Sequence, residues 1–223
     1  MTIDFGVKNR EEAEKLGLKP GVVGTTPLIF KEIANERAVG VGFDDKAGVA
    51  VIIKAMEMLI DKRLGGEVYA VATAQEEVGL RGAIISAYKI KPDMAIAVDV
   101  THSASANVKE SLVAGVDVGR GPVIGVGPNF HPKLWEMMEE VCKEKNIPYQ
   151  LGPTPAASGT DAWVIQVSRE GVVTGLISIP LRYMHSPGEV VSIKDLEYAS
   201  KLLAETILAI DKTDWRKLFS ISV

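Results

Sequence analysis

The sequence is poor in cysteine and has no long apolar run. Its single cysteine, Cys142, excludes a disulfide within the 223-residue chain, a usage typical of reducing compartments. Lys54 and Glu57 interrupt the longest apolar stretch, so none reaches the roughly 18–20 residues of a membrane-spanning helix. The opening stretch MTIDFGVKNREEAEK has no apolar segment of the signal-peptide kind. These absences predict a soluble, cytoplasmic protein.

An excess of positive charge is also absent. The 29 acidic and 25 basic residues give a formal net charge of −4, so we expect neither nucleic acid nor membrane as a partner. Hydrophobic residues make up 47% of the chain, enough for the core of one domain of this length. Cys142 lies in a helical pattern and is expected to be a buried, inert thiol.

The chain divides into two parts near residue 40. Residues 1–40 carry a charged helical turn, the loop signal Lys19-Pro20-Gly21 and short strands broken by Pro27 and Asn35. This part resembles a piece of a small β-rich unit. From residue 41 onward, helical patterns alternate with apolar strands, which predicts an α/β sandwich with a largely parallel, buried sheet.

The spacing of apolar residues predicts the individual elements of the second part. We expect helices over 46–63, 79–90, 131–146 and 192–212, with a further helix opening at Thr160 or Asp161. We expect strands over 67–74, 93–100, 121–127 and 171–179. Ser192, three residues before Asp195, is close to a capping box.

Polar side chains follow four of the apolar segments. They are Asp44 with Asp45, the pair Glu76 and Glu77, Asp99, and His185. In open α/β folds, ligands bind beyond the carboxyl ends of the strands. Carboxylates combined with an imidazole are the ligand mix expected for zinc, cobalt or manganese.

Each of these residues also has an ordinary structural interpretation. Asp44 is a possible helix N-cap, the glutamates a possible solvated loop pair, and His185 a possible structural histidine. Asp99 is harder to explain this way, because a carboxylate in an apolar strand is costly unless it is paired or metal-bound. Their coincidence at strand ends favours a metal site. Adjacent glutamates suit a hydrolase, where one binds metal and the other acts as general base.

At these residues the sequence resembles the dinuclear metallo-aminopeptidases of the tetrahedral, glutamyl-aminopeptidase-like family, some of whose members were labelled cellulases or endoglucanases. The matching stretches are GFDDKAGVAV, VYAVATAQEEVGLRGA, MAIAVDVT, SGTDAW, GVVTGLISIPLRYMHSPGEVV and IKDLE. The resemblance implies a three-layer α/β/α sandwich of the zinc-peptidase type. It makes residues 41–223 the catalytic domain and residues 1–40 a remnant of an inserted β-rich dimerisation domain.

Residue by residue, the resemblance implies a site for two divalent metal ions, zinc or cobalt, with manganese as a further possibility. Asp44 would bridge the two metals, next to an unusual cis peptide bond to Asp45. Glu77 and His185 would complete one metal site, and Asp99 would bind the other metal.

The resemblance also implies the reaction. Glu76 would be the general base for a metal-activated water that removes N-terminal residues from peptide substrates. Gly159 and Thr160 would lie near the scissile group. Family members assemble as dimers into dodecamers, so a homo-oligomer is expected.

The sequence departs from the family in one respect. Family members are longer and carry an early histidine in a His-x-Asp segment, upstream of the inserted domain. The first residues of this chain already resemble the later part of that insert. The resemblance therefore implies that the given sequence lacks the early histidine and the first strands of the sheet. The Asp44/Asp99 site then lacks its imidazole. His102 is close to Asp99 in sequence but on the wrong side of it, and His131 at a helix start suits a structural role.

Two further functions compete with the aminopeptidase. A non-catalytic or mono-metal homologue, acting as scaffold or assembly subunit, would follow from the missing histidine. A glycosidase needs two carboxyl groups about 5–9.5 Å apart on either side of a sugar, but the Asp/His set would then have no purpose.

Overall fold

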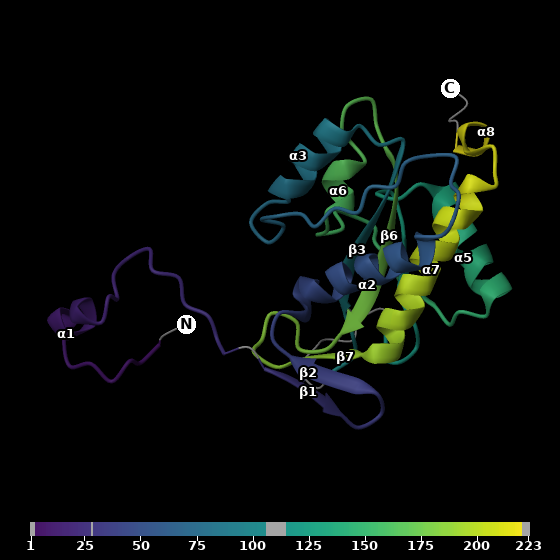
Figure 1. Ribbon diagram of the computed structural model, residues 1–223. Helices are drawn as coiled ribbons and strands as arrows, with labels where there is room; N and C mark the ends of the chain where they lie inside the picture. Colours follow the sequence, from purple (N-terminus) through teal and green to yellow (C-terminus); the bar gives the residue numbers. More distant parts are fainter. Residues whose placement is uncertain (1–2, 28, 106–114, 220–223) are drawn as a thin grey trace.

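The computed structural model describes residues 3–27, 29–105 and 115–219. Helix α1 (Arg10–Lys15), within the N-terminal segment, lies away from the main body of the molecule (Figure 1). Asn9 caps this helix by accepting a hydrogen bond from the Glu12 amide. The rest of the described chain is built around two sheets.

The larger sheet has four strands in the order β3-β6-β4-β5. Their bounds are β3 Met94–His102, β4 Val123–Val126, β5 Gln150–Pro153 and β6 Val173–Leu181. β3 runs parallel to β6, and β4 runs parallel to β5, but β4 pairs with β6 in the antiparallel sense. The sheet is therefore mixed, where the sequence predicted a largely parallel one.

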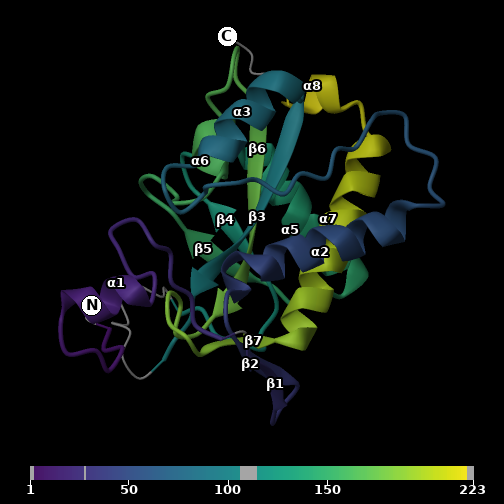
Figure 2. The same cartoon turned by 60° about the vertical axis from the view of Figure 1, so that its left-hand side comes forward.

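Helices cover both faces of this sheet (Figures 1 and 2). On one face lie α2 (Phe43–Leu59), α5 (Pro132–Lys145) and α7 (Ile193–Asp211), and on the other lie α3 (Arg81–Ile90) and α6 (Ala162–Ile165). Alternate residues of β6 join the two cores, because successive strand side chains point to opposite faces. Ile177 and Ile179 are in the larger core with α2, α5 and α7, and Leu176 is in the smaller one with Ala162. The three-layer arrangement is confirmed.

The smaller sheet is antiparallel, in the order β1-β2-β7. Its strands are β1 Phe30–Ile33, β2 Arg37–Gly40 and β7 Glu189–Ser192. β2 leads into α2 and β7 leads into α7, so this sheet fixes the starts of two long helices (Figure 1). The assignment of residues 1–40 to a dimerisation domain stays a prediction.

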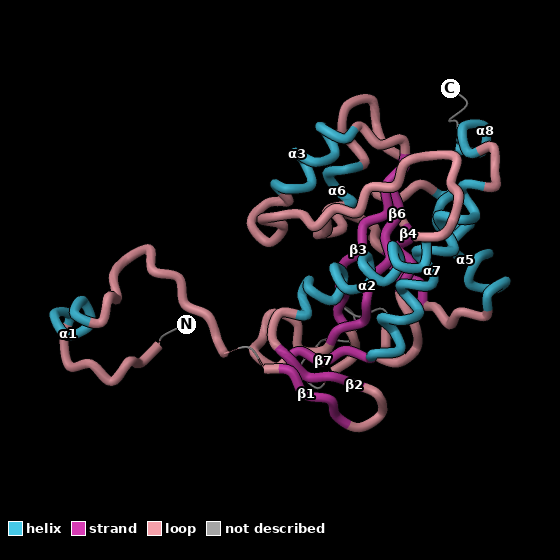
Figure 3. The backbone as a smooth tube through the Cα atoms, viewed as in Figure 1, coloured by secondary structure: helices cyan, strands magenta, loops and turns pink. Residues whose placement is uncertain are grey.

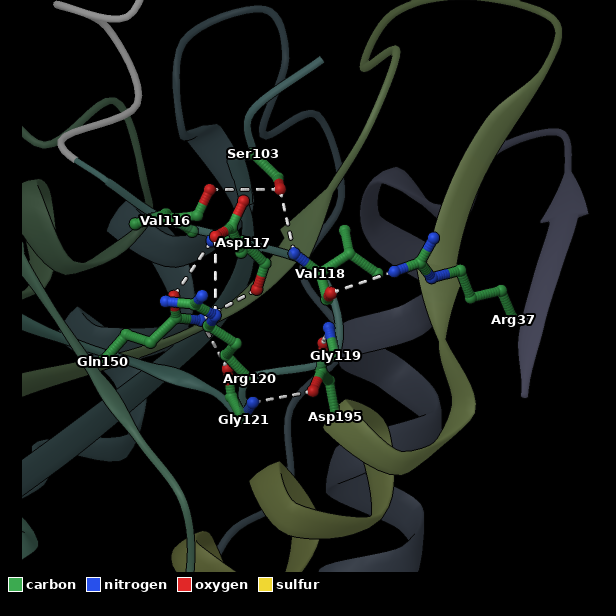
Figure 4. Close-up of polar contacts among 10 residues, drawn as sticks. All are labelled: Arg37, Ser103, Val116, Asp117, Val118, Gly119, Arg120, Gly121, Gln150 and Asp195. Atoms are coloured by element: carbon green, nitrogen blue, oxygen red, sulfur yellow. Dashed lines mark hydrogen bonds and ion pairs between the residues drawn. The ribbon is translucent and has the colours of Figure 1, made fainter. Parts of the chain in front are cut away.

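The N-terminus of α7 anchors the chain that enters β4. Ser192 caps α7 by accepting from the Asp195 amide, as predicted. The fully buried Asp195 carboxylate accepts hydrogen bonds from the Gly119 and Gly121 amides at 2.6 and 2.8 Å (Figure 4). Gly121 has φ +91°, and a Cβ there would clash with the Pro148 carbonyl oxygen, so only glycine fits.

The Gln150 side chain secures the same loop from the other side. Its Nε2 donates to the Asp117 and Gly121 carbonyl oxygens, both at 3.0 Å, and its Oε1 accepts from the Asp117 amide (Figure 4). Arg37 of β2 donates to the Val118 carbonyl oxygen. The loop thus links both sheets to α7.

One predicted strand does not form. Residues 67–74 run as an unpaired segment, drawn as loop between α2 and α3 in Figure 3. A strand needs neighbours to bond its backbone, and within the described chain none lies beside this segment. The other predicted helices and strands are present with shifted ends, except that the element opening at Thr160 is limited to α6. A short helix, α8 (Trp215–Phe219), follows α7. No helix among the described residues is long and apolar enough to cross a membrane.

Candidate metal centre

Three of the predicted ligands meet at one point. His185 Nε2 lies 3.0 Å from Asp44 Oδ2 and 3.7 Å from Glu77 Oε2. One potential ligand atom from each residue lies within 4.8 Å of the other two. We call Asp44, Glu77 and His185 the metal trio. Two carboxylates and an imidazole at these separations suit a zinc-type ion with ligand bonds of about 2 Å.

The metal trio comes from three separate parts of the chain. Asp44 is at the start of α2, Glu77 follows the unpaired segment 67–74, and His185 lies in the connection from β6 to β7. The side chains of His185 and Glu77 are 63% and 59% exposed, whereas that of Asp44 is 10% exposed. Among the described residues, one of the three side chains is therefore held inside the fold and two face solvent.

The backbone around the trio has uncommon conformations. The cis peptide bond between Asp44 and Asp45, which the resemblance implied, is present. His185 and Gln75 both have positive φ, at 62° and 63°. Non-glycine residues in this left-handed region are uncommon and concentrate at functional sites.

A buried glutamate that the sequence analysis did not single out joins two of these segments. Glu189, at the start of β7, is 2% exposed. Its Oε2 accepts from the amides of Phe43 and Asp44 at 2.7 and 3.3 Å, and its Oε1 accepts from the His185 amide at 3.2 Å. One carboxylate thus positions the backbone of two trio residues. The sequence signal that could have identified Glu189 was its position in the stretch RYMHSPGE, which is part of the family resemblance.

Four more carboxylates lie next to the trio: Asp45, Glu76, Asp99 and Asp161. Burial, followed by the charge of Asp99, raises the pKa of Asp45 to about 8. Burial likewise raises the pKa of Asp99 to about 8, with Glu76 and Asp44 adding to the effect. Buried carboxylates repel one another unless a cation lies among them. Four acidic groups thus crowd together beside the trio, and they raise one another's pKa values.

Glu76 and Asp44 show the same effect more weakly. Burial and then the charge of Glu77 raise the pKa of Glu76 to about 7, and the same two causes raise that of Asp44 to about 6. The acidic groups therefore interact electrostatically across the site. Glu76 lies close enough to the trio for the charges of all three residues to affect its pKa. Asp99 is not one of the three clustered ligands, so its metal-binding role stays a prediction.

Asp161 was considered in the sequence only as a helix cap. It does precede α6, but its side chain makes no capping hydrogen bond. Instead, Oδ2 accepts from the Thr73 hydroxyl at 2.6 Å, and Oδ1 is buried with no partner among the described residues. Burial raises its pKa. Its charge contributes to the raised pKa values of Glu76 and Asp99, so the carboxylate lies close to both of them.

The predicted substrate residues adjoin this aspartate. Thr160 is buried, with its hydroxyl 2.9 Å from that of Ser158, and Gly159 has φ +67°. Their substrate-binding role and the general-base role of Glu76 stay predictions.

The remaining histidines are outside the trio. His131 precedes α5 and packs its ring edge-on against Phe219, with ring centroids 5.4 Å apart. His102 is the exposed last residue of β3. Among the described residues, neither joins a group of three potential ligands.

Comparison with known proteins gives consistent matches. The family model for M42 glutamyl aminopeptidases matches residues 1–202. A lysyl aminopeptidase of Pyrococcus furiosus is 40% identical over 200 residues, which are 90% of this chain and 57% of the relative. The solved structure of an aminopeptidase from the archaeon Desulfurococcus kamchatkensis superposes with a TM-score of 0.83 at 39% identity, covering 99% of this chain and 62% of that protein.

A further solved relative bears on assembly. The TET1 peptidase of Pyrococcus horikoshii, described as able to assemble into a tetrahedron or a large octahedral shell, is 31% identical with a TM-score of 0.71. The match covers 92% of this chain and 59% of that protein. The chain therefore spans about three fifths of the length of the relatives it matches.

Proposed function

Because the chain belongs to the M42 glutamyl aminopeptidase family, we propose that it carries the metal centre of an aminopeptidase that removes N-terminal residues from peptides. The convergence of Asp44, Glu77 and His185 on one point, beside Glu76, is the observation that supports this proposal most directly.

The metal trio would hold a divalent ion of the zinc, cobalt or manganese type. Such an ion, when bound, supplies Lewis acidity for peptide hydrolysis. Asp44, the most buried ligand, would be the bridging one, with Asp99 on the side of a second ion. The carboxylates around Asp99 support a second cation, because their repulsion is relieved by positive charge.

Glu76 would move the proton in this reaction. It would accept a proton from the water that attacks the peptide carbonyl carbon and then return it to the departing amine nitrogen. The proposal is supported by the position of Glu76 next to Glu77 in the chain and by its absence from the group of three potential ligands. Gly159 and Thr160 would contact the substrate near the scissile bond.

A homo-oligomer is proposed as well. The support is the similarity to the TET1 peptidase, which can assemble into a tetrahedron or a large octahedral shell. Dimers would be the building unit, as the resemblance implies.

The second candidate is a mono-metal or non-catalytic homologue that serves as a scaffold. It is favoured by the carboxylates around Asp99, which have no imidazole among the described ligand groups. The glycosidase alternative is less well supported, because it leaves the metal trio unexplained.

The Glu76→Gln variant tests the proposal. It should abolish hydrolysis of aminoacyl p-nitroanilides by the zinc- or cobalt-loaded protein while the metal content per chain is unchanged. Glu67→Gln, an exposed glutamate earlier in the same segment, is the matched control and should keep wild-type activity. Full activity in Glu76→Gln would refute the general-base role. Stoichiometric metal without turnover in the wild type would favour the scaffold.

A further inference from the structure

A cavity of about 290 Å³ lies at the opposite end of the larger sheet from the metal trio. It is lined by the end of α3, the turn that leads into β3, the turn before β6, and α8, and α3 and α8 lie at this end in both views (Figures 1 and 2). Asp93 of the lining directly precedes β3, whereas Asp99, beside the trio, lies further along that strand. At about 3.3 Å per residue, these two positions are roughly 20 Å apart. We call the cavity between residues 91–93 and 168–172 the turn pocket.

Three residues that line the turn pocket have left-handed backbone conformations. Lys91, Arg169 and Gly171 have φ values of 59°, 54° and 101°. Non-glycine residues with positive φ are uncommon and concentrate at functional sites. The Arg169 side chain is also held in place, because its Nε donates to the Tyr88 carbonyl oxygen at 2.7 Å and its guanidinium carbon lies 3.7 Å from the centroid of the Tyr88 ring. The guanidinium is therefore preorganised, which lowers the entropy cost of binding a ligand.

The turn pocket carries two groups of each charge. Lys91 and Arg169 are basic, Asp93 and Glu170 are acidic, and all four residues line the cavity. Among the described residues, none of the four takes part in an ion pair. Opposite charges that line one cavity without contacting each other leave room for a ligand that carries both charges.

Much of the remaining lining is apolar. Ala87 and Pro92 contribute from the side of α3, Val172 from the turn before β6, and Trp215 from α8. The Trp215 ring is covered by its neighbour Arg216, whose guanidinium carbon lies 4.3 Å from the ring centroid. Pockets for drug-sized ligands usually measure about 300–1,000 Å³. The turn pocket is at the small end of this range, so it suits a small ligand with an apolar side chain.

We propose that the turn pocket binds a free α-amino acid with an apolar side chain. The carboxylate of the amino acid contacts Arg169 and Lys91, since a guanidinium fork matches a carboxylate in shape and charge. Its ammonium group contacts Asp93 and Glu170, and its side chain packs on Trp215. An α-amino acid carries one group of each charge and one side chain on a single carbon, which matches the lining. The inference concerns residues outside the metal centre and does not depend on the proposed peptidase activity.

The probe is L-leucine, added to the full chain after dialysis against a chelator, so that binding to a metal ion does not contribute. We expect saturable binding in saturation-transfer NMR with a dissociation constant of about 1 mM, because exposed ion pairs are weak. The analogue 4-methylpentanoate lacks the ammonium group and 3-methylbutylamine lacks the carboxylate, so each should bind at least about threefold more weakly. No saturable binding of L-leucine up to about 20 mM would overturn the proposal. Binding of either analogue as tight as that of L-leucine would also overturn it, because the site would then not recognise both charges.

Two variants locate the contact. Arg169→Gln removes the charge of a carboxylate partner, and Asp93→Asn removes that of an ammonium partner. Both residues are exposed, and Asp93 accepts the hydrogen bond of the Val173 amide through its backbone, so both variants should fold, which far-UV circular dichroism checks. Each should weaken L-leucine binding about three- to tenfold. Lys89→Gln and Asp61→Asn, which change exposed residues outside the pocket lining, are the matched controls and should bind like wild type. Wild-type binding by either folded test variant would contradict the proposed site.

Discussion

Replacing Glu189 should weaken metal binding at the candidate centre, although Glu189 itself is not one of the proposed ligands. Its buried carboxylate accepts hydrogen bonds from three backbone amides, those of Phe43, Asp44 and His185. A hydrogen bond to a charged group contributes about 1.5–3 kcal/mol, and an unsatisfied buried donor costs about 1–3 kcal/mol. Glu189→Gln keeps one acceptor oxygen, but it replaces the other with an NH₂ group. This donor would then face a backbone N–H donor and could not accept its hydrogen bond. We therefore expect the free energy of unfolding to fall by about 2–3 kcal/mol.

Thermal unfolding and zinc titration measure the two consequences. For a chain of this size, about 2–3 kcal/mol corresponds to a Tm lower by roughly 5–10 °C. Zinc should bind roughly 10–100-fold more weakly, as it does when groups that orient metal ligands are lost. Glu197→Gln, an exposed glutamate on α7, is the matched control and should change neither quantity. A Glu189→Gln protein with wild-type Tm and zinc affinity would refute the positioning role.

Three other predictions concern stability and reactivity. Asp45 and Asp99 have pKa values near 8, above those in the unfolded chain, so the native state binds more protons than the unfolded state between about pH 4 and 8. The metal-free protein should therefore lose stability as pH rises through that window, and zinc should flatten the slope; urea midpoints at pH 5 and pH 8 measure this, and a rise in the metal-free midpoint would contradict it. Burial raises the pKa of the Cys142 thiol to about 12, so it should react with an aromatic disulfide reagent only after unfolding, and rapid native labelling would show that the thiol is accessible. Asp195→Ala leaves the Gly119 and Gly121 amides without an acceptor and should lower the free energy of unfolding by about 2–4 kcal/mol, with Asp195→Asn intermediate; an unchanged urea midpoint in Asp195→Ala would argue against this anchor.

Much of the fold could be read from local patterns. Strands β3 and β6 and helices α2, α5 and α7 have clear apolar periodicity, and each formed near its predicted bounds. The segment 67–74 has an equally apolar pattern but is unpaired, because a strand depends on neighbours that its own residues do not specify. The antiparallel pairing of β4 with β6 was missed for the same reason.

The candidate site was predictable where chemistry and spacing coincide. Asp44, Glu77 and His185 follow apolar segments, and the structure brings them together. Glu189 and Asp161 resemble ordinary loop and cap residues in sequence, so their burial and their hydrogen bonds became visible only in three dimensions. Asp99 was predicted to bind metal because an unpaired carboxylate in an apolar strand is energetically costly. It lies among the neighbouring carboxylates rather than in the trio.

The dispersal of the trio along the chain has a kinetic consequence. Asp44 and Glu77 are separated by α2, and His185 arrives after the whole four-stranded sheet. Closing such long loops costs chain entropy before any ligand contact offsets it, and long-range contacts slow folding. If the trio binds a metal as proposed, we expect tight binding only at the last stage of refolding, well after the helices have formed. A refolding chain would show helical circular dichroism first and metal uptake only once the sheet is assembled.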